Sequence, residues 1–290
     1  MKGDVLKPIS YKAALESHER NQWQKAMEEE FTALISNNTW KKVEPPTDAR
    51  TLRGKWVYKV KRDLNNAIAR FKARWVVKGY EQQFGIDYDQ TYAGVAKGAL
   101  WKVLLALASV LDLEVEQMDA VTAFLNGETK ELIYVELPDG FKDGNQVCKL
   151  QKALYGLKQA PRLWQEKLRT ELQKLGFQPL NADNCIYTTT DGLLGISIVT
   201  HVDDFLLIGP SLTAINKFKL KLGSIFPMKD LGPCSQFLGI RLLRDRKART
   251  IQLVQDSYAR KVVSAFGLEK SSPVWTPMES SALISMVPYD

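Results

Sequence analysis

The first 120 residues alternate between helix-like and strand-like patterns of apolar positions. From Tyr11 to Leu34 large apolar side chains recur every three or four residues and Asn37–Asn38 ends the run, which predicts one helix. Residues 55–77 hold two β-rich runs around the turn 63–66, which predicts a hairpin. Further along, an apolar stripe predicts a helix over 100–111, and a strand is expected over 113–119.

The second half continues this mixture. Pro161 is placed to open a helix that Gly176 ends, and Ser211 is placed to cap the next one. A hairpin, 237–243 against 250–254, and a short helix over 258–266 follow. Separate hairpins and helices indicate an α+β fold rather than a doubly wound sheet.

One apolar segment carries charges in its middle. Between Gly195 and Gly209, Ile, Val, Phe and Leu surround the adjacent carboxylates Asp203 and Asp204. Desolvating each charge costs several kcal/mol unless a cation or partner meets it. A turn explains a bend here but not two charges, whereas a divalent metal explains both.

Composition narrows the class of protein. The 290 residues are 45% apolar and carry a net charge of +7, which suits a polyanionic partner. The three cysteines form no C-x-x-C pair, the two histidines make a zinc site improbable, and neither a signal peptide nor a membrane-length apolar run is found. We therefore expect a soluble, intracellular protein, cytoplasmic or nuclear, with no membrane partner.

Several segments in one order resemble the reverse transcriptase of copia-type LTR retrotransposons. They are KARWVVKGY (72–80), GIDY (85–88), QMDAVTAFLNG (117–127), LYGLKQAPRLW (154–164), HVDD (201–204), FPMKDLG (226–232) and FLGI (237–240). The resemblance implies a right-hand polymerase fold with fingers, a palm with an antiparallel sheet and packed helices, and an incomplete thumb. It divides the chain into a helical extension (1–36) and a reverse transcriptase domain (37–280), with fingers 50–95, palm 96–240 and the start of the thumb 241–280.

Two-metal chemistry gives the carboxylates a role. Two Mg²⁺ ions can catalyse the joining of a nucleotide to a primer 3′-OH. Carboxylates and phosphates bind Mg²⁺ well, and Mn²⁺ can replace it. We expect Asp119 and Asp203 to be the principal catalytic metal ligands, assisted by Asp204, with the small residues Ala120 and Ala123 letting a nucleotide approach. The plain alternative is that Asp119 is a polar strand end and Asp203–Asp204 a simple turn.

The resemblance also implies nucleotide-binding residues. Phe124 would be the aromatic platform under the incoming sugar, or simply a core residue. Lys158 would reach the template or nucleotide, and Gln159 would hydrogen-bond near the templating base, unless it is an exposed residue at a helix entry. Lys72 and Arg74 lie where residues 55–78 hold eight Lys or Arg and one acid, so they would grip triphosphate and template, the alternative being a solvated charged face.

Primer contacts are implied at His201 and at Leu238–Gly239, where close backbone approach would explain the glycine, although a simple hairpin residue also fits. Lys229 would protonate the leaving pyrophosphate. Two positions depart from the family pattern: His201 replaces a tyrosine and Gly94 a proline. These departures indicate weakened activity and a looser fingers–palm connection.

Two functions of different classes remain open from sequence. The first is an RNA-directed DNA polymerase domain that uses an RNA template, a DNA primer and dNTPs. The second is a decayed, non-catalytic remnant that binds nucleic acid. A metal-dependent phosphodiesterase is a third reading, because clustered carboxylates also serve nucleases. No segment resembles the RNase H or integrase partner domains of such polyproteins.

Overall fold

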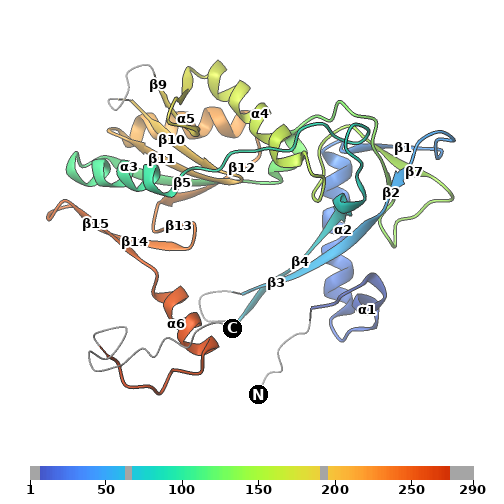
Figure 1. The fold of residues 1–290 in the computed structure, drawn as a ribbon, viewed down its shortest axis with the longest axis horizontal. Helices are drawn as coiled ribbons and strands as arrows, with labels where there is room; N and C mark the ends of the chain where they lie inside the picture. The colour runs from blue at the N-terminus through green and yellow to red at the C-terminus, as the bar shows by residue number, and fades with distance from the viewer. Residues whose placement is uncertain (1–6, 63–66, 190–194, 275–290) are drawn as a thin grey trace, which may run out of the picture. The chain divides into compact units, whose positions relative to one another are not determined.

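The computed structural model describes residues 7–62, 67–189 and 195–274 (Figure 1). The chain divides into two compact units, one formed by residues 1–234 and 244–251, the other by 235–243 and 252–290. The predicted turn 63–66 lies outside the described residues. No helix among the described residues is long and apolar enough to cross a membrane.

The first unit begins with two helices rather than the single helix predicted. Helix α1 (Tyr11–Glu16) is capped by the Ser10 hydroxyl, and α2 (Arg20–Ser36) follows after a break. The prediction failed because apolar spacing continues through the break, whereas the backbone at Ser17 is extended. Asn38 ends the pattern as expected, with a left-handed φ of 51°.

The predicted hairpin is present as β3 (Gly54–Arg62) and β4 (Ile68–Val77). Its apolar face packs on α2, where Trp23 lies edge-on to Tyr58 and to Phe71 at ring distances of 5.2 and 4.6 Å. Since side chains alternate along a strand, the cations of β4 lie on the opposite face. Helices α1 and α2 are therefore packed into the same core as the β3–β4 hairpin, and the predicted division into an N-terminal extension and fingers stays a prediction.

A small sheet adjoins this core. It has the order β1 (Trp40–Val43), β7 (Val147–Leu150), β6 (Tyr134–Glu136) and β2 (Thr51–Leu52), and only the β2–β6 pair is parallel among its described strands. The 3-10 turn η1 (Gly79–Glu81) follows β4.

The larger sheet is antiparallel and positions the candidate site. Its order is β12 (Met228–Pro233), β5 (Glu114–Ala120), β11 (Asp204–Gly209), β10 (Ser197–His201), β9 (Asp183–Thr189) and β8 (Phe177–Leu180). The predicted strand 113–119 is confirmed as β5. The segment 195–209 is a hairpin of two strands, with its turn at Val202–Asp203.

Helices α4 (Ala160–Lys174) and α5 (Leu212–Ile225) cover one face of this sheet, because their apolar stripes share a buried cluster with Met118, Phe205 and Leu207 (Figure 1). Helix α3 (Gly98–Val110) packs against β5 and β11, and the 3-10 turn η2 (Ala123–Asn126) follows β5. The predicted ends are confirmed: Pro161 lies in the first turn of α4, Gly176 follows it at φ 88°, and the Ser211 hydroxyl caps α5.

The second unit contains β13 (Gln236–Phe237), most of β14 (Ile240–Asp245) and α6 (Asp256–Ala265). β15 (Thr250–Val254) adjoins β14 in the sheet order β13-β14-β15. The predicted hairpin of 237–243 against 250–254 is present as β14 and β15, but its first strand begins at Ile240, because Leu238 and Gly239 have positive φ values of 49° and 78° and form a tight turn between β13 and β14. Helices packed on antiparallel sheets confirm the α+β class.

Candidate active site

Four residues from four strands form one row across an end of the large sheet. Asp119 of β5 pairs in register with Asp204 of β11 on one side and with Lys229 of β12 on the other. Asp204 in turn pairs with His201 of β10. Directly opposed residues of antiparallel strands present their side chains on the same face, with Cβ atoms about 5 Å apart. The topology therefore gathers residues that lie as much as 110 positions apart in sequence.

Asp203 lies in the two-residue turn beside this row. Its carbonyl accepts a hydrogen bond from the Ala120 amide at 2.7 Å, which joins the turn to the end of β5. The preceding Val202 has a φ of 59°, an unfavourable value for a β-branched residue. The Trp164 indole donates to the Val202 carbonyl at 2.7 Å. Such strain persists only where surrounding contacts fix it, and it concentrates at functional sites.

Burial and neighbouring carboxylates disfavour ionisation of Asp119 and Asp204 in the row. Burial raises the pKa of the Asp119 carboxyl, and repulsion from Asp203 raises it further. Burial likewise raises the pKa of Asp204, followed by repulsion from Asp203 and Asp119. Three carboxylates are thus close enough to oppose one another's ionisation.

This donor set fits hard divalent cations. Carboxylate oxygens are the ligands that Mg²⁺ prefers, and excess negative charge in a half-buried site favours a bound cation. Within the described ranges, no three His, Cys, Asp or Glu side chains already stand in a metal-coordinating arrangement. Binding two ions would thus require Asp119, Asp203 and Asp204 to turn toward a common centre.

The basic hairpin faces this acidic end of the sheet. Lys61 and Lys72 lie close enough to Asp119 for their positive charges to lower its pKa, as does Lys229. Lys72 itself is partly desolvated, and this burial, together with repulsion from Arg74 and other cations, lowers its pKa. The cations of the hairpin thus interact electrostatically with a carboxylate, and they do not form only a solvated charged face.

Two aromatic rings lie between the cations and the carboxylates. The Arg74 guanidinium stacks over the Tyr155 ring, 4.5 Å from its centre. Tyr155 meets Phe124 edge-on at 5.2 Å, and Phe124 is half-buried against both apolar clusters. Phe124 is therefore at once a core residue and a neighbour of the candidate site, so its role as a sugar platform stays a prediction.

The LYGLKQAPRLW segment is fixed by the loop that follows the fingers hairpin. Lys158 donates to the Tyr88 hydroxyl at 3.0 Å and stacks over the Tyr88 ring. Gln159 is fully buried: its amide donates to the Asp87 carbonyl at 2.7 Å and accepts from Gln82 at 3.0 Å. The alternative of an exposed helix-entry glutamine is wrong. Contact between Gln159 and a templating base stays a prediction, and the described hydrogen bonds give it a positioning role.

Three further expectations need revision or remain open. Ala120 and Ala123 are buried in the core, so they do not open a path for a nucleotide. The amide of Gly94 donates to the Gln165 side chain at 3.0 Å, a bond that proline could not make, so this departure adds a contact. Gly239 is explained by its positive φ, with no atom within 4 Å of an added Cβ among the described residues; primer contact by Leu238–Gly239 stays a prediction.

His201 and Lys229 have contrasting surroundings. The Nδ1 atom of His201 is buried and has no hydrogen-bond partner in the described part of the chain. Lys229 is exposed beside Asp119. Their proposed roles toward primer and pyrophosphate remain predictions.

Sequence reasoning missed a buried ion network next to the row. Lys219 of α5 donates to Glu116 at 2.7 Å and to Asp230 at 2.6 Å, and the Asp230 carboxylate also accepts from the Gly232 amide. Burial by itself would raise the pKa of Asp230. The hydrogen bonds from Lys219 and Gly232 have the larger effect, so the pKa of Asp230 is lowered. The signal in the sequence was a lysine within the apolar stripe of α5, four residues after Ile215.

Comparisons with known proteins identify the family of this chain. Residues 37–280 match the family described as reverse transcriptase (RNA-dependent DNA polymerase). The chain is 42% identical over 286 residues to the Retrovirus-related Pol polyprotein from transposon TNT 1-94 of Nicotiana tabacum, covering 97% of this chain and 22% of that protein. It is 34% identical over 279 residues to the Pol polyprotein from transposon RE1 of Arabidopsis thaliana, covering 95% of this chain and 19% of the relative.

Among solved structures, a foamy viral protease–reverse transcriptase in complex with ds DNA is similar with a TM-score of 0.44 and 11% identity, over 82% of this chain and 36% of that one. The chain thus spans about a fifth of the length of the polyproteins above. The residues that match this family, 37–280, include the acidic row, the basic hairpin and the LYGLKQAPRLW segment. The chain therefore belongs to the reverse transcriptase (RNA-dependent DNA polymerase) family, as the reverse transcriptase domain of a copia-type retrotransposon polyprotein.

Proposed function

We propose that this chain itself catalyses RNA-directed DNA synthesis, adding dNTPs to a primer 3′-OH at the acidic row. The observation that carries the proposal is the register that pairs Asp119 with Asp204 beside the Asp203 turn, opposite the cations of β3 and β4. Mutual repulsion among these carboxylates makes the site a strong attractor for divalent cations.

Asp119, Asp203 and Asp204 would hold the metal pair. When bound, two Mg²⁺ ions would supply the means to deprotonate the primer 3′-OH and to stabilise the leaving pyrophosphate. The chain's own part is positioning: the Trp164 and Ala120 hydrogen bonds fix the backbone of the turn that carries Asp203, so that metal binding would require the carboxylate side chains, rather than this backbone, to reorient.

The hairpin cations would bind the anionic substrate. Lys72 and Arg74 offer an ammonium and a guanidinium to a triphosphate, and Arg74 is already oriented by the Tyr155 ring. Lys229 would give a proton to pyrophosphate, and its pairing with Asp119 in the row supports this role. Phe124, on the other side of Tyr155, would lie under the sugar, and His201 and Leu238–Gly239 would contact the primer strand.

The proposed partners are an RNA template, a DNA primer and dNTPs. The relatives are Pol polyproteins, so we also propose that the chain acts as part of such a polyprotein. Its basic composition suits nucleic-acid partners, and we propose that it acts in the cytoplasm or nucleus.

Primer extension tests the proposal. Purified chain, an RNA template, a labelled DNA primer, dNTPs and Mg²⁺ should give extended primer, and Asp203→Asn should abolish extension while leaving binding of the primer–template intact. Binding without extension by the unaltered chain would identify the decayed, non-catalytic remnant. Release of nucleotides from labelled DNA without dNTPs would identify a phosphodiesterase.

A further inference from the structure

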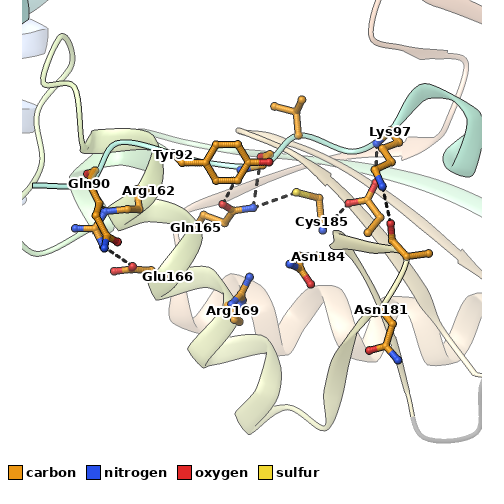
Figure 2. Close-up of a pocket in the computed structure, with 14 residues that line it drawn as sticks. Gln90, Tyr92, Lys97, Arg162, Gln165, Glu166, Arg169, Asn181, Asn184 and Cys185 are labelled. Carbon is orange, nitrogen blue, oxygen red and sulfur yellow. Dashed lines mark hydrogen bonds and ion pairs between the residues drawn. The ribbon is translucent and has the colours of Figure 1, made fainter.

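A cavity of about 500 Å³, lined by polar side chains, lies outside the acidic row (Figure 2). Its walls are the segment 90–97, one face of α4, and the turn into β9 at 181–185. The α4 residues that face it are Arg162, Gln165, Glu166 and Arg169, which share a helix face by their spacing. The volume lies within the range of about 300–1,000 Å³ that is usual for ligand sites.

Two of the three cations in the walls have partners in the fold. Arg162 pairs with Glu166 at 2.5 Å and donates to the Gln90 carbonyl at 3.0 Å. Lys97 donates to the Ala182 carbonyl at 2.9 Å. These contacts join the three walls to one another, as the dashed lines in Figure 2 show.

The two carboxylates in the walls also have partners in the fold. Glu166 serves Arg162, as described above. Asp183 is buried and accepts hydrogen bonds from the Lys97 amide at 2.7 Å and the Cys185 amide at 2.9 Å. Among the described residues, neither acid forms an ion pair with the third cation.

Arg169 is the cation that remains. Its Nε atom is buried without a hydrogen-bond partner, and no carboxylate among the described residues forms an ion pair with it. Its described polar neighbour is the buried hydroxyl of Tyr187. A partly buried guanidinium without a counter-charge is costly, and an anionic ligand would remove that cost.

The remaining groups suit more than a simple anion. Tyr92 at the rim is 84% exposed, a ring on which a base can stack. The Asn184 side chain lines the same cavity as Arg169 (Figure 2), and no described residue hydrogen-bonds its amide, which can both donate and accept. A phosphate for the guanidinium, a base for the ring and hydrogen-bonding edges for the amide together describe a nucleotide.

We propose that this cavity is a second nucleotide-binding site, in which Arg169 binds a phosphate, Tyr92 stacks on the base and Asn184 hydrogen-bonds the nucleotide. The site is separate from the catalytic row and does not depend on the proposed polymerase activity. The nucleotide can come from solution or from a nucleic-acid strand, since both present the same phosphate, sugar and base.

Equilibrium binding without divalent metal or dNTPs tests the proposal. The probes are inorganic phosphate, AMP and a ten-nucleotide oligo(A) RNA, each titrated onto the purified chain. We expect AMP or the RNA to bind more tightly than phosphate. Arg169→Gln should weaken that binding about tenfold, Arg169→Lys should weaken it less, and Tyr92→Ala should also weaken it. Binding of AMP identifies a site for free nucleotides, and binding of the RNA alone identifies a strand site.

Lys167→Gln is the matched control. Lys167 lies on α4 but pairs with Glu171 at 3.1 Å and does not line the cavity. The proposal fails if Arg169→Gln binds both probes as the unaltered chain does, or if Lys167→Gln loses as much.

Photo-crosslinking locates the bound nucleotide without using activity. Irradiated 8-azido-AMP should label peptides from 89–97 or 181–189 in the unaltered chain. Labelling confined to peptides from 117–127 or 201–209 would assign the binding to the acidic row and overturn the proposal. Because neither assay needs DNA synthesis, failure here is distinguishable from failure of the polymerase proposal.

Discussion

Two of the carboxylates on strand β5, Glu116 and Asp119, lie three residues apart and have opposite surroundings. Glu116 is buried and bound to the ammonium of Lys219, which also holds Asp230. Asp119 is half-exposed, lies between Asp204 and Lys229 in the row, and forms no ion pair among the described residues, while the charge of Asp203 opposes its ionisation. A charge that the fold has already paired contributes to structure, whereas one left among like charges is available for a ligand.

The two sites are also coupled in space. Asp230 directly follows Lys229, and the register between β12 and β5 shifts between Asp230 and Gly232. Such irregularities re-aim the side chains of a strand. The buried network therefore helps fix β12 where Lys229 faces Asp119.

The largest expected effect separates these two carboxylates by activity. Asp119→Asn should reduce nucleotide incorporation far more than the roughly 100-fold loss typical of residues behind a metal ligand, because it removes a proposed ligand itself. Glu116→Gln should keep most of the incorporation per folded molecule. Primer-extension rates measure both, with the exposed Asp143→Asn as control. Equal loss in the two variants would remove the distinction drawn above.

The stability of the fold, in contrast to its activity, should depend on the buried network around Lys219. Lys219→Met leaves Glu116 buried without a partner, so the free energy of unfolding should fall by about 3–5 kcal/mol. Adding Glu116→Leu should restore much of it, because an apolar pair avoids the unpaired charge. Urea denaturation measures these changes. A Lys219→Met protein as stable as the parent would show that the network carries no structural load.

The pH dependence should distinguish the acidic row from the network. The pKa values of Asp119 and Asp204 are raised above their ordinary value of 3.8, so the folded state binds protons more readily than the unfolded state. Their contribution to stability therefore falls as pH rises through the raised pKa values. The pKa of Asp230 is lowered, so its contribution is lost as pH falls through that lowered value.

Unfolding measured between pH 3.5 and 7 tests this sign. Relative to the parent, Asp119→Asn should gain stability as pH rises from about 4, because it removes a charge that the others oppose. Asp230→Asn should lose stability relative to the parent over the same range. If the difference in unfolding free energy between Asp119→Asn and the parent did not change with pH, the three carboxylates would not repel one another.

The smallest expected effect concerns His201, which pairs with Asp204 at the edge of the row. His201→Tyr would remove the unpartnered Nδ1 atom and restore the residue expected from the family resemblance. Incorporation should rise about threefold, which corresponds to less than 1 kcal/mol of activation free energy. Steady-state primer extension measures it, and an unchanged or lower rate would show that histidine is not the cause of weakened activity.

Much of the local structure was predictable from sequence because its signals are local. Apolar spacing located α3, α4 and α5, and cap chemistry at Ser211 and Gly176 located helix ends. The break between α1 and α2 and the turn at Leu238–Gly239 were missed because apolar spacing continues through both, while backbone dihedrals decide them.

The sequence by itself determined which residue types are present for metal and phosphate chemistry, and the order of motifs that indicates the family. Only the tertiary structure decided that Asp119, Asp204 and Lys229 share one row, that Glu116 is paired while Asp119 is not, and that Arg169 lacks a counter-charge. The physical reason is that pairing register and burial arise from contacts between segments far apart in the chain, and these contacts set the desolvation and charge environment of each group.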